Sequence, residues 1–244
     1  MIWLAIIALG LVAGTVGGVI GFGGSVILIP ALTIAFGAKQ AVPIMAVAAL
    51  LANGGRVLIW WRATDWRAVA AFALTAAPGA ALGARTLIAL NEAWIEIGLG
   101  CFLIALVPIR RWLAARGFVL KLAGLALVGA PLGFLTGLVA STGPVNAPVF
   151  LAYGLTKGAF IGTEAASSLA MFVTKAGAFS LFGALPPEVA LRGLIVGATL
   201  MTGAWLAKRL VERFEPAQFR LLIDAVVVIA GLSILANAYY AANS

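Results

Sequence analysis

Long runs of apolar residues, separated by short polar stretches, cover almost the whole chain. Each run is continuous rather than alternating, which is typical of helices and not of the strands of a barrel. Most of the runs are long enough to cross a hydrocarbon core that needs about 20 residues. The predicted segments are roughly 2–20, 25–37, 41–61, 68–88, 94–109, 120–139, 144–155, 159–183, 189–207 and 219–240.

Two of these segments, 25–37 and 144–155, are too short to cross a bilayer as helices. At about 1.5 Å per residue they reach roughly two-thirds of the hydrocarbon thickness or less. Each follows a break rich in small residues, Gly21-Phe22-Gly23-Gly24 before the first and Ser141-Thr142-Gly143 before the second. A short helix after such a break predicts a re-entrant helix or half-helix, with the break inside the protein rather than against lipid.

The two breaks belong to a repeat that spans the chain. A shift of 118 residues aligns Pro30 with Pro148 and Lys39 with Lys157. Corresponding loops carry opposite charge bias, so the two halves should lie upside down relative to each other. We therefore expect an all-α polytopic membrane protein with two inverted-topology repeats of about five segments each, residues 1–116 and 117–244, in one integral membrane domain.

The composition supports a membrane protein and gives its orientation. Of 244 residues, 64% are hydrophobic and 10% are charged, whereas a soluble domain carries about 25% charged residues. The basic residues that give a net charge of +8 fall mainly in the loops at 62–67, 110–121 and 208–220. The positive-inside rule places these loops in the cytoplasm, with both chain termini outside.

The same residues exclude other classes of function. Basic residues confined to loops do not predict a nucleic-acid interface. The chain has no histidine and one cysteine, Cys101, so it lacks the commonest metal ligand and general base. No nucleotide-binding motif occurs either. We therefore expect no enzyme activity, no cofactor and no metal site.

Several glycine-rich stretches together resemble a known family. The first extends from Gly17 through Gly23-Gly24-Ser25 to Pro30, and the next is Pro78-Gly79-Ala80-Ala81-Leu82-Gly83-Ala84-Arg85. The second copy extends from Gly133 to Pro148, followed by Gly154–Lys157 and Gly162–Glu164. On these residues the chain resembles the TauE/SafE family of sulfite exporters and sulfonate permeases. The resemblance implies transport of a small sulfur-containing or organic anion, although Ser25 and Ser141–Pro144 depart from the glycine runs usual in the family.

The breaks are the predicted anion-binding site. A broken helix exposes N–H groups, and the N-terminus of the following helix carries roughly half a positive elementary charge. Asn53 and Arg56, one turn apart, could add side-chain contacts. The alternative for the small residues is close helix packing alone. The predicted substrate-binding residues are Gly23, Gly24, Ser25, Ser141, Thr142, Gly143, Asn146, Asn53 and Arg56.

Other charged residues lie within or near predicted segments. Glu164 could couple proton movement to anion movement, because a desolvated carboxyl group binds its proton more tightly; a cap or snorkel near the membrane edge is the alternative. Lys39 could attract anions or neutralise a helix end. Arg85 is expected to be an interfacial anchor, and Lys175 could pair with Asp224.

Together with the family resemblance, the sequence therefore predicts a secondary transporter that moves a small anion, sulfite or an organosulfonate or organic acid, across the membrane by alternating access. We expect this transport to be coupled to protons or to the membrane potential. An anion channel or uniporter and an accessory membrane subunit are the alternatives. The expected partners are the anion and membrane lipid, without nucleic acid, and a homodimer is compatible with the sequence.

Overall fold

The computed structural model describes residues 2–20, 24–91, 94–95, 97–98, 100–102, 104–105, 108, 112, 119–139, 142–155, 157–210 and 232. Within these residues every regular element is a helix, so the predicted all-α class is confirmed. The described elements are α1 (Ile2–Ile20), α2 (Gly24–Phe36), α3 (Ala38–Trp60), the 3-10 helix η1 (Trp61–Ala63), α4 (Trp66–Ala89), α6 (Leu122–Leu138), α7 (Gly143–Ala152), α8 (Lys157–Leu181) and α9 (Pro187–Leu210).

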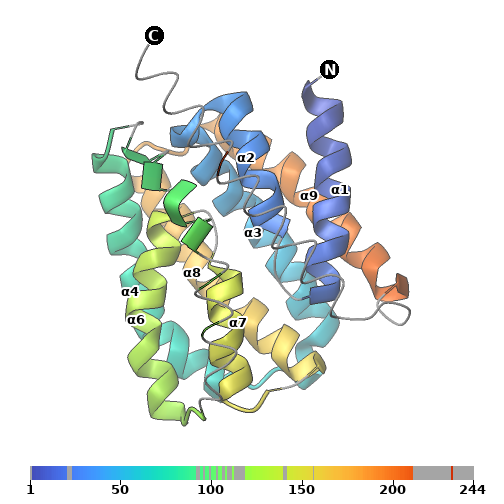
Figure 1. The fold of residues 1–244 in the computed structure, drawn as a ribbon, viewed down its shortest axis with the longest axis vertical. Coiled ribbons are helices and arrows are strands. Elements are labelled where there is room, and N and C mark those ends of the chain that lie inside the picture. Colours follow the sequence, from blue (N-terminus) through green and yellow to red (C-terminus); the bar gives the residue numbers. More distant parts are fainter. Residues whose placement is uncertain are drawn as a thin grey trace.

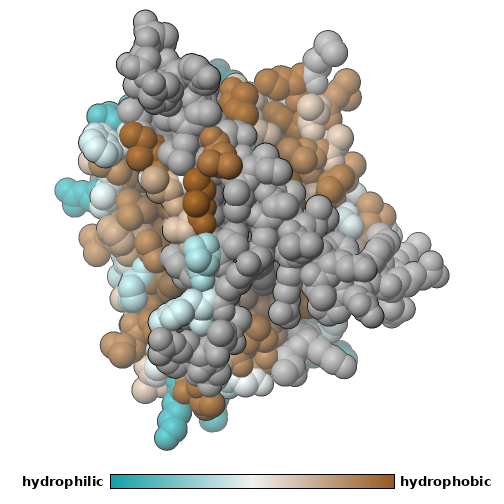
Figure 2. All heavy atoms as spheres, in the orientation of Figure 1, coloured by the Kyte–Doolittle hydropathy of each residue, from teal (hydrophilic) through white to brown (hydrophobic). Residues whose placement is uncertain are grey.

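The described helices have the length and surface of membrane spans. Three are long and apolar enough to cross a bilayer, namely Ala38–Ala63, Trp66–Ala89 and Pro187–Ala207. Large apolar side chains such as Leu74 and Leu127 are nearly four-fifths exposed. Hydrophobic residues also dominate the described surface in Figure 2. A surface this apolar fits lipid rather than water, and the protein is a polytopic membrane protein.

The two short helices each return beside the helix that precedes them. The rings of Trp3 and Phe36 lie 5.5 Å apart, so α2 ends next to the start of α1. In the second half, the Leu120 amide donates to the Ala152 carbonyl oxygen at 2.8 Å, so α7 ends next to the start of α6. The chain therefore forms two helical hairpins, α1–α2 and α6–α7.

The hairpins open at opposite ends of the molecule. A glycine with positive φ follows each one, Gly37 (φ 78°) before α3 and Gly154 (φ 97°) before α8, a conformation that glycine adopts without strain. The start of α8 lies at the far end of α3, because the Thr163 hydroxyl accepts from the Asp65 amide at 2.9 Å, just after η1. We call these two ends the Gly37 face and the Gly154 face, at the top and bottom of Figure 1.

The helix pairings are symmetric between the two halves. At the centre α3 packs against α8. Around them α9 packs against α3 and α1, and α4 packs against α8 and α6. In the repeat, α1 corresponds to α6, α3 to α8 and α4 to α9. This correspondence converts α1–α9 into α6–α4 and α3–α9 into α8–α4, and it leaves α3–α8 unchanged. Together with hairpins that open at opposite faces, this pattern supports the predicted inverted repeats.

Small residues allow the outer helix pairs to approach closely. A Cβ atom added to Gly14 on α1 would lie 2.8 Å from the Leu200 Cα atom on α9. On the other side, a Cβ atom added to Gly137 on α6 would lie 2.7 Å from the Gly83 Cα atom on α4. Close approach through small residues is typical of helices packed in lipid, where no hydrophobic force drives helices together.

The predicted segments can now be compared with the helices. The segments 25–37 and 144–155 correspond to α2 and α7, and both short helices follow a break as predicted. Segment 94–109 is helical at each of its described positions. Apart from Leu232, segment 219–240 lies outside the described residues, as does the predicted repeat boundary at 116/117, so the division into domains stays a prediction.

Candidate functional site

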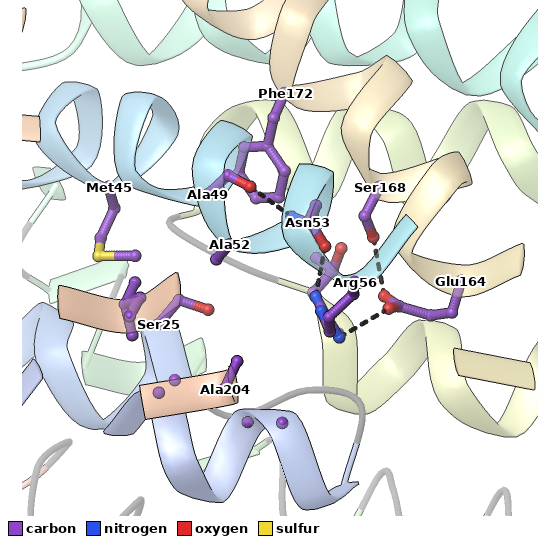
Figure 3. Close-up of a pocket in the computed structure, with 17 residues that line it drawn as sticks. Ser25, Met45, Ala49, Ala52, Asn53, Arg56, Glu164, Ser168, Phe172 and Ala204 are labelled. Carbon is purple, nitrogen blue, oxygen red and sulfur yellow. Dashed lines mark hydrogen bonds and ion pairs between the residues drawn. The ribbon is translucent and has the colours of Figure 1, made fainter. Parts of the chain in front are cut away.

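A cavity of about 50 Å³ lies where both hairpins meet the central helices (Figure 3). Since one water molecule needs about 10–15 Å³ of such volume, the cavity has room for a few waters or a small solute. Its walls come from α1, α2, α3, α8, α9 and the start of α7. The lining residues are Gly14, Gly17, Gly18, Gly24, Ser25, Met45, Ala49, Ala52, Asn53, Arg56, Thr142, Gly143, Glu164, Ser168, Phe172, Leu200 and Ala204.

Both short helices begin at this cavity. Gly24 and Ser25 open α2, Gly143 opens α7, and Thr142 precedes it. The first turn of any helix has N–H groups without intrahelical partners and carries roughly half a positive elementary charge. Pro144 in the first turn of α7 has the fixed φ that suits this position. Two positive helix ends thus point toward one small space, which favours an anion there.

Side chains of α3 and α8 form a polar network across the cavity wall. The Arg56 guanidinium donates through Nη1 to Glu164 Oε2 at 3.4 Å and through Nη2 to Asn53 Oδ1. The Ser168 hydroxyl donates to Glu164 Oε1 at 2.8 Å. The side-chain amide of Asn53 donates through Nδ2 to the Ala49 carbonyl oxygen, also at 2.8 Å. The network therefore connects the two central helices through one ion pair, as Figure 3 shows.

The ion pair between Arg56 and Glu164 is largely buried, so each charge depends on the other. The Glu164 side chain is 1% exposed and that of Arg56 is 12% exposed. Removing either partner of such a pair leaves an uncompensated charge away from water, which is strongly unfavourable. A guanidinium has five N–H donors, and the two bonds described here do not use all of them. Arg56 can therefore hold Glu164 and still present donors to a solute in the cavity.

The structure brings most of the predicted site residues together. Seven of them line the cavity, namely Gly24, Ser25, Asn53, Arg56, Thr142, Gly143 and the predicted coupling residue Glu164. Gly23 and Ser141 lie outside the described residues. Asn146 is buried in α7 but does not line the cavity, and its Oδ1 atom has no hydrogen-bond partner within the described part of the chain.

Three glycines, Gly14, Gly18 and Gly24, both line the cavity and pack closely against neighbouring helices. A Cβ atom added to Gly24 would lie 2.9 Å from Leu200 Cδ2 and 3.0 Å from the Ala13 carbonyl oxygen. Gly14 and Gly18 both line the cavity and both lie against α9. These three glycines therefore allow close helix packing and also line the cavity, so whether packing is their whole role stays a prediction.

Two polar contributions were not predicted. Ser168 is one helical turn after Glu164 and bonds to its carboxylate, so its i+4 spacing was the available signal. The hydroxyl groups of Thr136 and Thr142 contact each other across the second break. Thr136 lies within the glycine-rich stretch Gly133–Pro148, which was the available signal. Within the described residues, no group of three or more metal-ligating side chains occurs.

The remaining charged candidates lie elsewhere. Lys175 is fully buried and donates to the carbonyl oxygens of Thr136 and Val139 at 2.6 Å each. Its predicted partner Asp224 lies outside the described residues. Lys39 is exposed at the Gly37 face. Arg85 is also exposed, with its guanidinium 5.9 Å from the centre of the Phe182 ring, as an interfacial anchor would be.

Two interrupted hairpins that enter from opposite faces and share a buried polar cavity define a membrane protein of the transporter class. The chain belongs to the sulfite exporter TauE/SafE family, whose model matches residues 6–234 of the 244. The resemblance found at the glycine breaks is thus confirmed over nearly the whole chain, and the family is one of transporters rather than enzymes. Comparisons with curated proteins and with solved structures give no match.

Proposed function

We propose that this protein is a secondary transporter that moves sulfite, or an organosulfonate or organic acid of similar size, across the bacterial plasma membrane. The single observation that carries the proposal is the shared cavity, where the N-terminal ends of α2 and α7 meet the guanidinium of Arg56. Three positive groups around a space of about 50 Å³ favour a small oxyanion over a large or neutral solute. Membership of a sulfite exporter family supports the same substrate class.

In the proposed binding step, the anion occupies the cavity and accepts hydrogen bonds from Arg56 and from the first turn of α2, and the positive end of the α7 dipole attracts it. The first turn of α7 acts through its dipole rather than through amides, because the Val145 and Asn146 amides already donate to the Thr142 carbonyl oxygen and Pro144 has no N–H. The Ser25 side chain and the Thr142 hydroxyl contribute at the two helix ends. Planar guanidinium groups bind sulfonate-like and carboxylate oxygens in pairs, which orients the solute. Binding is thus expected to depend on the charge of Arg56 and on helix ends that only an intact break provides.

Glu164 gives a route for coupling. An ionised Glu164 would compete with the anion for the positive charge of the same guanidinium, even where N–H donors are left over, since Arg56 Nη1 lies 3.4 Å from Glu164 Oε2. A proton on Glu164 removes this competition and frees Arg56 for the anion. Proton and monovalent anion would then bind together and move as a neutral pair. The membrane potential is the alternative driving force, if Glu164 stays ionised throughout the cycle.

The packing suggests which parts move during alternating access. The hairpin α1–α2 packs against α9, and the hairpin α6–α7 joins α4 through α6. Close glycine contacts should keep α1 with α9 and α4 with α6 as rigid units. We propose that these two units rock about the central pair α3 and α8, which exposes the cavity first to one face and then to the other.

The proposal is tested with purified protein in liposomes, by measuring uptake of radiolabelled sulfite. Saturable uptake that an imposed proton gradient accelerates is the expected result, and Arg56→Gln should reduce it by about tenfold or more because a buried charge contact is lost. Uptake that does not saturate and reaches channel conductance would replace the carrier by a channel. Absence of uptake by the purified protein alone would favour an accessory subunit.

A further inference from the structure

Lys175 is a buried cation that the proposed binding step does not use. Its side chain is fully buried in α8. The ammonium donates to the carbonyl oxygens of Thr136 and Val139, at the C-terminal end of α6, at 2.6 Å each. It also lies 5.9 Å and 5.6 Å from the ring centres of Phe172 and Phe179, within the range of a cation–π contact.

This lysine lies between two cavities. Glu164, Ser168 and Phe172 line the central cavity, and Phe179 lines a second cavity of about 270 Å³ at the Gly37 face. The spacing of these residues and of Lys175 along α8 is three or four, so they share one side of the helix. The second cavity, which we call the Gly37-face cavity, also has Lys39 and Gln40 in its wall. One side of α8 thus extends from the central cavity, past the buried Lys175 ammonium, to the Gly37-face cavity.

The repeat gives Lys175 a counterpart. The shift of 118 residues aligns Lys175 with Val57, the residue after Arg56. Each central helix therefore carries one cation within one residue of the same repeat position, and because one residue turns a helix by about 100°, the two side chains are neighbours in the alignment rather than strict equivalents. In inverted repeats, equivalent positions lie on opposite sides of the midplane. Arg56 contacts the central cavity in this structure, whereas Lys175 is held by the end of α6.

We infer that Lys175 is a second anion-binding group of this transporter, which receives the small oxyanion between the central cavity and the Gly37-face cavity when its ammonium leaves the carbonyls of Thr136 and Val139. The inference rests on the proposed function, because it assigns a second position to the same substrate. In the structure described here the ammonium closes that position, with Phe172 and Phe179 on either side.

A structural cap alone is a poor explanation of Lys175. A cation near a helix C-terminus stabilises the helix only modestly. Taking an ammonium out of water costs considerably more, even with good hydrogen bonds. The partners that the structure describes are neutral carbonyl oxygens, which compensate the hydrogen bonds but not the charge. Ionisable groups held inside membrane proteins in this way usually mark a substrate or ion pathway.

Three substitutions of Lys175 separate its charge from its hydrogen bonds. Lys175→Arg keeps the charge, Lys175→Gln keeps neutral donors for the α6 carbonyls, and Lys175→Met keeps neither. Each is purified at full length, checked for folding by thermal unfolding in detergent, and assayed for uptake of radiolabelled sulfite into liposomes. Thr174→Val is the matched control on α8, because among the described residues its hydroxyl bonds to the Ala170 carbonyl oxygen of its own helix, at 3.0 Å, and to no other helix.

The expected result is that the arginine variant and the control retain most of the uptake, while the glutamine and methionine variants lose about tenfold or more. Wild-type uptake by Lys175→Gln overturns the inference, because a cap then accounts for the residue. A glutamine variant that fails to fold beside a folded arginine variant overturns it as well, since the charge then serves the fold. Absence of uptake by the wild-type protein itself instead rejects the proposed function.

Discussion

Arg56 and Glu164 are 108 residues apart in the chain and yet form the ion pair at the centre of the site. Each belongs to one of the two central helices, so the pair connects the two repeats directly. Asn53 and Ser168 hold the two charged groups from one turn away on their own helices. The geometry therefore gives both charges fixed directions, which a solute-binding site requires.

The proposed role of Glu164 in coupling predicts a pH dependence of anion binding. A protonated carboxyl group no longer competes for Arg56, so anion affinity should rise as the pH falls. Glu164→Gln imitates the protonated state and should bind the anion with an affinity independent of pH, and its flux should no longer follow a proton gradient. The measurement is thermal stabilisation by methanesulfonate between pH 5 and pH 9, because the charge of this sulfonate is constant there and stabilisation reports affinity.

Ser167→Ala is the control for that experiment. Its hydroxyl is buried beside Glu164 without a hydrogen-bond partner among the described residues, so its loss should leave the pH dependence in place. If Glu164→Gln keeps the wild-type pH dependence, Glu164 is not the coupling residue and the membrane potential becomes the better candidate for the driving force.

At the scale of single residues, the sequence predicted what depends on local pattern. Gly24, Ser25, Thr142 and Gly143 were found because a break before a short helix is visible in the chain itself. The pairing of Arg56 with Glu164 was not predicted, because it depends on how α3 crosses α8. Asn146 was placed in the cavity from its proximity in sequence, but one helical turn of α7 carries it away from the lining.

The helix hairpins are the elements that build the site. Each consists of a longer helix, a break and a shorter helix, and each is held to a neighbouring long helix by glycines. The close contact lets the short helix begin deep within the protein, beside the cavity. Glycine here has a packing role that a sequence pattern of small residues cannot distinguish from a binding role, because both need the absence of a side chain.

The packing role makes a prediction about helix stability. Gly83→Ala would place a Cβ atom 2.9 Å from the Gly137 Cα atom, so α4 and α6 must separate, at a cost of about 1–3 kcal/mol. Gly177→Ala on α8 meets no described atom within 4 Å and should be neutral or stabilise the helix by about 0.5–1 kcal/mol. Thermal unfolding midpoints of the two detergent-purified variants check this. Equal midpoints would contradict the proposed tight α4–α6 contact.

For the whole molecule, the symmetric helix pairings show how one sequence repeat can build a site with access from two faces. The alignment at 118 residues predicted matched short helices, and the structure places them in hairpins that open at opposite faces. Segment periodicity alone could not give the helix pairings, because most lipid-facing and most protein-facing positions of the described helices are apolar alike. The small residues on α1, α4, α6 and α9 decide those pairings instead.

The orientation of the molecule is the remaining prediction at this scale. The Gly154 face carries Arg62, Arg67 and Lys121 close to the ends of α3, α4 and α6. The positive-inside rule therefore places the Gly154 face in the cytoplasm and the start of α1, at the Gly37 face, outside. Lys39, Arg85 and Arg192 near the Gly37 face oppose this bias, and Arg192 keeps its charge because its partner Gln40, at 2.7 Å, is neutral.

Single cysteines introduced into a Cys101→Ala background test the orientation in intact cells. Asn91→Cys and Glu188→Cys, one in each repeat at the Gly37 face, should react with a membrane-impermeant maleimide. Ala63→Cys and Lys121→Cys at the Gly154 face should react only after the membrane is permeabilised, and all four positions are exposed in the structure. The reverse pattern would invert the orientation. Different labelling of Asn91→Cys and Glu188→Cys would contradict the arrangement of the helices itself, because both residues lie at one face only if α4 and α9 run in opposite directions.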